Sequence, residues 1–202
     1  YNTYKNLVRH QQICPVCHSY SKDFEVCTKC KHKVFFDWIY INYIYRWELK
    51  KDILNLKFLH FYNTAKELSK LFNIDILDKF DKSKIIVTYV PNHWLRRHFI
   101  KGYNQSKLLA KYFAQDNWLK FMETTKKIKY TKSQTKLKRQ QRLSNLKWSF
   151  KLLPNLNLKW DEIIIIIDDI TTTGSTINEL AQTMKAEFPK LKVRWMVLAR
   201  NN

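Results

Sequence analysis

A run of five isoleucines, residues 163–167, dominates the hydrophobic pattern of the chain. Consecutive β-branched residues are typical of a central parallel strand that is buried on both faces. Further strands are predicted at 84–90, 146–150 and 193–198, and helices at 61–73, 104–119 and after residue 176. Strands that alternate with helices imply an α/β fold with a parallel or mixed sheet flanked by helices.

Two carboxylates and a hydroxyl-rich loop follow the isoleucine strand. Asp168 and Asp169 stand at its carboxyl end, and the loop TTTGST occupies residues 171–176. Thr176 and Glu179 fit a capping box, which predicts that an amphipathic helix begins at the loop. Free amides at a helix start suit a phosphate, and paired acids suit the hydroxyls of an attached sugar. The stretch therefore predicts a sugar-phosphate site, the alternative being two solvated aspartates after an ordinary strand.

The glycine content excludes other phosphate-binding motifs. The chain has two glycines, Gly102 and Gly174, which lie far apart in the sequence. A Walker A loop needs two glycines close together in the sequence with a lysine, and a dinucleotide fingerprint needs three glycines. A nucleotide-like ligand must therefore bind a loop with one permissive backbone position.

All four cysteines lie in one short segment, CPVCHSYSKDFEVCTKC. Two CxxC pairs predict a structural zinc site with four thiolate ligands, Cys14, Cys17, Cys27 and Cys30. Two disulfides are the alternative, which a cytoplasmic chain disfavours. His18 and His32 are interpreted as bystanders. We expect a small zinc ribbon at 1–34, and metal binding would drive the folding of this ribbon. A larger domain is expected at 35–202, and it begins with an aromatic connector at 35–50.

The net charge of +20 favours polyanionic partners, although lysine-rich composition alone could produce it. Positive charge is clustered: residues 120–142 carry nine Lys or Arg against one acid, Glu123. Trp47 and Trp94 are candidates for stacking on unpaired bases. The candidate nucleic-acid contacts are Lys29, Lys31, Lys33, Lys136, Lys138, Arg139 and Arg142.

The hydrophobic content of 45% is sufficient for a packed core, so disorder is not expected. No apolar run approaches the roughly 20 residues of a membrane-spanning helix. No signal peptide is recognisable either, and the two observations together predict a soluble, cytoplasmic protein.

The stretch 163–176 resembles the phosphoribosyl-pyrophosphate (PRPP) loop of type I phosphoribosyltransferases. The resemblance implies that fold, with Asp168 and Asp169 on the ribose hydroxyls and magnesium bound with PRPP. It also implies that the 5′-phosphate is held by Thr171, Thr172, Thr173, Gly174, Ser175 and Thr176. Arg97 and Lys101, in the basic loop around Gly102, are either pyrophosphate ligands or solvated loop cations.

The order of motifs along the chain is similar to that of the ComF proteins of bacterial natural competence. After the paired CxxC motifs come Lys57–Phe58, Val90–Pro91, Lys101–Gln105, Leu109–Ala110, Gln134, Leu137, Arg142, Asn145 and Phe150, and then the PRPP loop. Lys101 replaces the usual arginine of that family, which keeps the charge but loses the planar fork.

The ComF resemblance implies a zinc finger joined to a phosphoribosyltransferase-like domain that acts on incoming single-stranded DNA. The implied partners are PRPP, single-stranded DNA, the competence helicase and a recombination mediator. Two functions remain open: a DNA-binding competence factor that carries PRPP, which we favour, and an active transferase that moves phosphoribose onto an acceptor. Arg139, Arg142 and Asn145 fit either a loop over the ligand or a DNA track.

Overall fold

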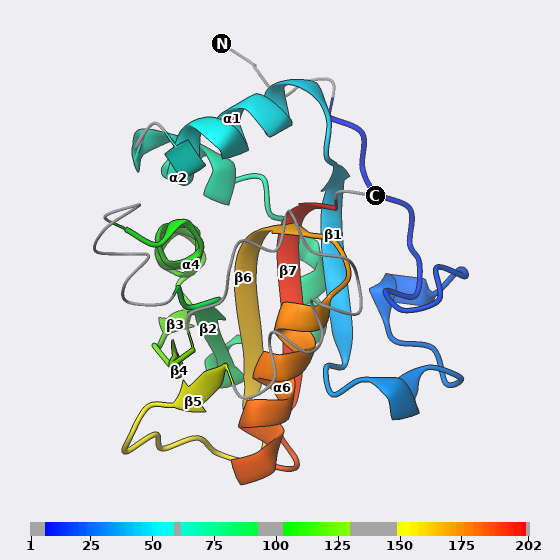
Figure 1. Cartoon of the computed structure of the whole chain (residues 1–202), viewed down its shortest axis with the longest axis vertical. Coiled ribbons are helices and arrows are strands. Elements are labelled where there is room, and N and C mark those ends of the chain that lie inside the picture. Colours follow the sequence, from blue (N-terminus) through cyan, green and yellow to red (C-terminus); the bar gives the residue numbers. More distant parts are fainter. Residues whose placement is uncertain (1–6, 59–61, 93–102, 130–148, 201–202) are drawn as a thin grey trace.

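The computed structural model describes residues 7–58, 62–92, 103–129 and 149–200 (Figure 1). Its main sheet has five strands in the order β1-β7-β6-β2-β3, and every neighbouring pair is parallel. These strands are β1 (Trp38–Ile44), β2 (Ile85–Tyr89), β3 (Lys120–Phe121), β6 (Ile163–Thr171) and β7 (Lys192–Arg200). A separate antiparallel pair consists of β4 (Thr125–Lys127) and β5 (Phe150–Leu152). The α/β fold predicted from the alternating pattern is confirmed.

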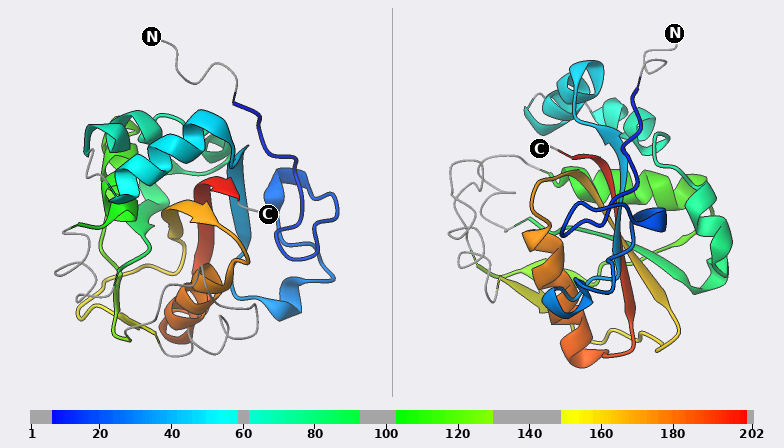
Figure 2. Two further views of the ribbon diagram at one scale, coloured as in Figure 1. Left: turned by 45° about the horizontal axis from the view of Figure 1, so that its top comes forward. Right: turned by 90° about the vertical axis from the view of Figure 1, so that its right-hand side faces the viewer.

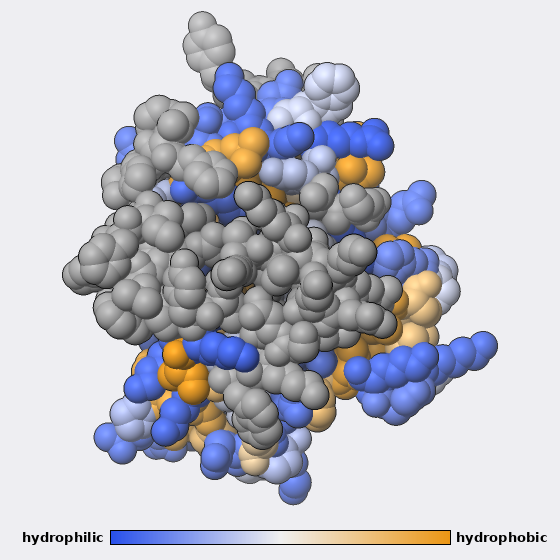
Figure 3. All heavy atoms as spheres, viewed as in Figure 1, coloured by the Kyte–Doolittle hydropathy of each residue, from blue (hydrophilic) through white to orange (hydrophobic). Residues whose placement is uncertain are grey.

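Helices cover both faces of the sheet, as Figure 2 shows where the sheet is seen nearly edge-on. The α-helices are α1 (Trp47–Phe58), α2 (Tyr62–Ser69), α4 (Gln105–Asp116) and α6 (Ser175–Glu187). Short 3-10 helices are η1 (Lys22–Phe24), η2 (Lys31–Lys33), η3 (Asp75–Lys79) and η4 (Lys82–Lys84). In the space-filling view, hydrophilic residues lie around the periphery of the visible face, with apolar patches between them (Figure 3).

The isoleucine run of β6 supplies side chains to two separate hydrophobic clusters. Ile163, Ile165 and Ile167 join the cluster that contains α1, α2 and α4. Ile164 and Ile166 point to the opposite face and join the cluster of α6 and the N-terminal residues. Side chains alternate along a strand, so five consecutive apolar residues are needed when both faces are covered. This confirms the predicted central strand.

The connector expected at 35–50 is instead regular structure. It contains the edge strand β1 and the start of α1, because Trp38, Ile39 and Ile41 are buried against the sheet faces. Residues 7–10 then pair antiparallel with β1, through Ile44 N donating to Val8 O at 3.0 Å and His10 N to Asn42 O at 3.1 Å. This pairing covers the outer edge of the sheet.

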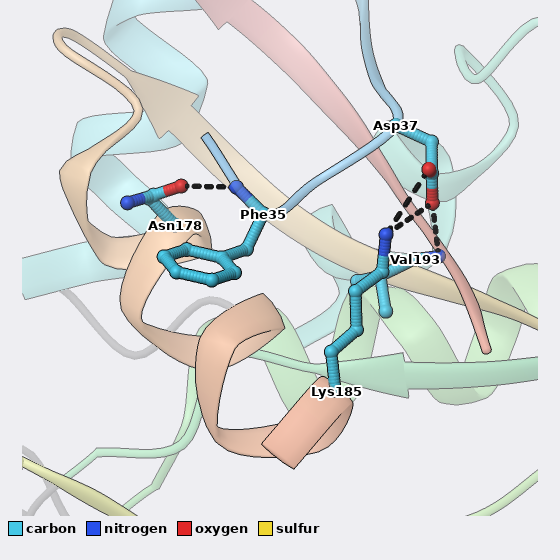
Figure 4. A network of polar contacts seen from close by, with 5 residues as sticks. All are labelled: Phe35, Asp37, Asn178, Lys185 and Val193. Atoms are coloured by element: carbon cyan, nitrogen blue, oxygen red, sulfur yellow. Dashed lines mark hydrogen bonds and ion pairs between the residues drawn. The ribbon is translucent and has the colours of Figure 1, made fainter. Parts of the chain in front are cut away.

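Asp37 fastens the N-terminal residues to β7 and α6 (Figure 4). Its carboxylate accepts a hydrogen bond from Val193 N at 2.7 Å and lies 3.1 Å from Lys185 Nζ. Two residues earlier, Phe35 N donates to Asn178 Oδ1 at 2.8 Å. These contacts join residues that precede β1 to the face of the sheet that α6 covers.

We expect Asp37→Ala to lower the free energy of unfolding by about 1–2 kcal/mol, because the charged acceptor of the Val193 amide is removed. Asp78→Ala is the matched control, since the exposed Asp78–Lys82 pair should contribute less than about 0.5 kcal/mol. Urea unfolding followed by circular dichroism would measure both. Equal losses of stability in the two variants would contradict a role for Asp37 in docking.

Candidate functional site: the carboxyl edge of the sheet

The two acids of the predicted ribose site lie within the last residues of β6. The strand continues beyond the isoleucines to Thr171, and it places Asp168 beside Val197 of β7. Asp168 Oδ1 accepts a hydrogen bond from Ser106 Oγ at 2.6 Å and from the amide of Asp169 at 3.0 Å. Burial, and next the charge of Asp169, raise the pKa of Asp168 to about 7. Asp168 is therefore a carboxyl group that changes its charge near neutral pH.

Asp169 is held by a buried ion pair. It is 6% exposed, and its Oδ2 lies 2.8 Å from Lys57 Nζ of α1. Burial acts to lower the pKa of Lys57, but the charge and hydrogen bond of Asp169 outweigh it and the pKa is raised. The other carboxylate oxygen of Asp169 accepts from the Ile170 amide at 2.7 Å. The ion pair fixes this side chain between α1 and the sheet.

The predicted phosphate loop leads directly into α6, and the predicted capping box is wrong. The helix begins at Ser175 after Gly174, which has φ +72° and forms no side-chain cap. A left-handed residue at this point favours glycine, and an added Cβ would meet Ile39 Cδ1 at 3.3 Å. The first helical bond runs from Asn178 N to Gly174 O, so the amides of residues 175–177 precede it. These first-turn amides are donors suited to an anion.

Two buried polar groups near the acids lack a partner among the described residues. They are Thr171 Oγ1, at the end of β6, and Gln105 Nε2, in the first turn of α4. The neighbouring Asn104 has a structural role instead, since it caps α4 and donates to Val90 O at 2.9 Å. Buried polar atoms without partners are uncommon in folded proteins and are consistent with a bound polar ligand.

The four cysteine sulfurs gather around one point, all within 4.8 Å of one another. Cys17 Sγ and Cys27 Sγ are 3.7 Å apart. A tetrahedral zinc ion with bonds of about 2.3 Å separates its ligand sulfurs by about 3.8 Å, so the four cysteines could hold a metal such as zinc. The Ser19 hydroxyl at 3.0 Å and the Ser19 amide lower the pKa of Cys17 to about 6. This favours the thiolate at Cys17, whereas burial raises the pKa of Cys27 and raises that of Cys30 to about 12, so metal binding there would have to displace the thiol protons.

Each CxxC pair is shaped by a backbone turn. Cys14 O accepts from His18 N at 2.9 Å, and Cys27 O accepts from Cys30 N at 2.9 Å. His18, predicted to be a bystander, has φ +65° and lies 2.6 Å from Arg200 Nη2 through its Nε2. The cysteine segment is therefore tied to the end of β7.

The phosphate loop also borders a cavity of about 1300 Å³. Thr172, Thr173, Gly174 and Ser175 line one side, and residues of the cysteine segment, including Cys17, line another. The acids and Thr176 do not line this cavity, although they were predicted together with the loop. Of the lysines predicted to contact nucleic acid, Lys33 lies in its wall, whereas Lys29 and Lys31 are exposed elsewhere on the cysteine segment.

Several predicted site residues lie outside the described residues. They are Arg97, Lys101, Lys136, Lys138, Arg139 and Arg142, together with Asn145. Conversely, Lys57 and Ser106 contact the acids although neither was predicted to be a site residue. Lys57 is part of the Lys57–Phe58 motif of the ComF resemblance, and Ser106 directly follows the Asn104–Gln105 motif. Their position in or beside these motifs was the sequence signal that could have identified them.

Comparison with known proteins agrees with this arrangement. Residues 102–202 match the family described as the phosphoribosyl transferase domain. The chain therefore belongs to the phosphoribosyltransferase domain family.

Three relatives extend the comparison. DNA utilization protein YhgH of Salmonella typhi is 39% identical over 95 residues, covering 45% of this chain and 39% of that protein. Its counterpart from Escherichia coli K12 is 33% identical over 140 residues, or 65% of this chain and 59% of that protein. Competence protein F of Haemophilus influenzae is 33% identical over 92 residues, which are 44% of this chain and 39% of the relative. The chain thus covers between 39% and 59% of these relatives, which confirm the resemblance to ComF-type proteins.

No helix within the described ranges is both long enough and apolar enough to cross a membrane.

We expect Lys57→Met to destabilise the fold by about 3 kcal/mol, because it leaves Asp169 buried without its counter-charge. Lys70→Met, which removes an exposed partner of Glu67, should cost less than about 0.5 kcal/mol. Thermal and urea unfolding would test both. If the double variant Lys57→Met, Asp169→Asn is no more stable than Lys57→Met alone, the ion pair is not the cause.

Proposed function

We propose that the chain binds PRPP with magnesium at the carboxyl edge of the sheet and serves as a nucleic-acid-handling factor in natural competence. The observation that carries this proposal is the pair Asp168 and Asp169, which lies three residues before a loop whose helix-start amides are available for a phosphate. The two carboxylates would accept hydrogen bonds from the ribose hydroxyls, and the amides and hydroxyls of 172–176 would bind the 5′-phosphate. Magnesium would neutralise the pyrophosphate.

The geometry supports a sugar phosphate better than a phosphate alone. Asp168 is fixed by Ser106 and Asp169 by Lys57, so both carboxylates are oriented before a ligand arrives. Thr171 Oγ1 and Gln105 Nε2 offer further polar atoms without partners among the described residues. A preorganised set of polar groups at the carboxyl ends of parallel strands is where α/β proteins bind nucleotides.

The competence role is supported by the relatives and by the charge. Two of the similar proteins are named for DNA utilization and one for competence. A net charge of +20 would attract single-stranded DNA and make its binding depend steeply on salt. We therefore favour a factor that binds DNA and PRPP over an active transferase.

PRPP binding should disappear in Asp168→Asn, Asp169→Asn, while DNA affinity changes little. Because Asp168 has a raised pKa of about 7 and must be ionised to accept ribose hydroxyls, PRPP affinity should rise about tenfold from pH 6 to pH 8. Calorimetry with and without magnesium measures both effects, and Asp116→Asn, at an exposed site, is the control.

Unchanged PRPP affinity in the double variant would refute the ligand site. Release of pyrophosphate that depends on PRPP and on an added nucleobase would instead identify a transferase and contradict the carrier role.

We further propose that Cys14, Cys17, Cys27 and Cys30 bind one structural zinc ion per chain. Cys27→Ser should lose the metal and the fold of the cysteine segment, because metal binding provides its folding energy. His32→Ala, an exposed neighbour, should retain one zinc. Elemental analysis and resistance to proteolysis would measure the two results. Full retention of zinc by Cys27→Ser would contradict the four-thiolate site.

A further inference from the structure

The cavity beside the phosphate loop is enclosed by segments that are distant in the sequence. Its volume is about 1300 Å³, and its walls come from the cysteine segment, the ends of β1 and β7, and residues 172–175. The N-terminal residues run beside β1 in Figure 2, which places the cysteine segment next to the sheet. The carboxyl ends of β1, β6 and β7 meet at this edge because the three strands are parallel.

Among the described residues that line the cavity, every charged side chain other than the thiol of Cys17 is positive. Arg9, Arg46, Arg200 and Lys33 contribute cations, and no Asp or Glu is present in the wall. Acids are available elsewhere at this edge, since Asp168 and Asp169 end the neighbouring strand, yet they lie outside the cavity. Away from Cys17, the wall therefore favours an anion.

Arg200 gives the strongest indication of an anionic ligand. It is 7% exposed, and its guanidinium lies 2.6 Å from His18 Nε2. No carboxylate of the described chain forms an ion pair with it. A guanidinium has five donors, and a buried charge ordinarily requires a counter-charge. An anion in the cavity would supply it.

Neutral donors on the opposite wall suit the same ligand. Ser175 presents a hydroxyl and a first-turn amide of α6, and Gly174 lacks a Cβ that would narrow the approach. Helix-start amides bind phosphate oxygens well, and arginine matches phosphate with paired donors. The chemistry of the cavity is therefore that of a phosphate site.

An exposed tryptophan beside Arg46 indicates which phosphate compound binds. Trp47 is 81% exposed, begins α1 and has φ +48°. Proteins that bind single-stranded nucleic acid combine a positive groove for the backbone with aromatic rings on which bases stack. Arg46 lines the cavity and Trp47 follows it in the chain, although Trp47 is not itself part of the wall, so these two elements stand on consecutive residues.

We propose that this cavity binds the phosphate backbone of single-stranded nucleic acid, with Arg9, Arg46 and Arg200 contacting phosphates and Trp47 stacking on a base. This inference rests on the proposed nucleic-acid function and assigns it a location. It places the strand against residues 172–175, the loop that is also proposed to bind the 5′-phosphate of PRPP, so the two ligands would share the donors of Ser175.

The test measures binding of a fluorescent oligothymidylate of about 20 nucleotides to the full chain by anisotropy over a range of salt concentrations. Arg46→Ala should weaken binding and reduce the log–log salt slope by about 0.7 for each phosphate that is no longer neutralised. Trp47→Ala should weaken binding by between about 5-fold and about 150-fold at an unchanged slope, and Trp47→Phe should restore most of it.

Matched controls separate this site from general charge and aromaticity. Trp118→Ala removes a ring that is 96% exposed after α4, and Lys192→Ala removes an exposed charge at the opposite end of β7 from Arg200. Both should bind like the unaltered protein. All four substituted residues are exposed, so the variants should fold.

Two results would overturn the proposal, and they differ from a failure of the proposed function. If Arg46→Ala and Trp47→Ala match the controls while the unaltered protein binds DNA, the strand binds elsewhere. In the second result, inorganic phosphate or thymidine monophosphate displaces less oligonucleotide from Arg46→Ala than from the unaltered protein. If it does so while the affinity for the oligonucleotide itself is unchanged, the ligand is a small free phosphate. Absence of DNA binding by the unaltered protein at low salt would refute the nucleic-acid function itself.

Discussion

The burial of β6 on both faces is the constraint on which the arrangement of the site depends. Five isoleucines alternate between two hydrophobic clusters, so a shift of the strand by one residue would bring a flanking carboxylate, Glu162 or Asp168, into a position that an isoleucine fills. Its fixed register places Asp168 beside Val197 and ends the strand at Thr171. The polar residues that follow must therefore emerge at the carboxyl edge. Lys57 and Ser106 then reach the acids from α1 and α4, which pack on the same face.

The cysteine segment is part of the same edge because interactions of the segment itself and of the residues that follow it fix it to the domain. Asp37 bonds to Val193 and Lys185, Phe35 N bonds to Asn178, and His18 meets Arg200. Asn178 also closes the first helical bond after Gly174, so one residue contacts both the N-terminal segment and the start of α6. A metal that orders the cysteines would thus also hold one wall of the cavity beside the phosphate loop.

The sequence was sufficient for features set by local pattern. The β6 strand, its acids and the cysteine cluster each follow from consecutive residues or from short spacing. The prediction of a connector at 35–50 is wrong because the burial of Trp38 and Ile41 depends on β7, a partner more than 150 residues away. The capping box failed because Gly174 adopts a left-handed conformation that replaces a side-chain cap. Lys57 was not assigned to the site because its pairing with Asp169 is a tertiary interaction.

The basic cavity could not be predicted for a similar reason, and its composition supports the proposed function more specifically than the total charge does. Exposed lysines spread over a surface are screened by salt, and they attract any polyanion alike. Arg200 differs because it is buried, and its neighbour His18 offers a ring nitrogen instead of a carboxylate. The interaction that docks the cysteine segment thus gives Arg200 no counter-charge. Since Arg9, Arg46 and Ser175 line the same space, docking of the segment would also form the proposed anion site.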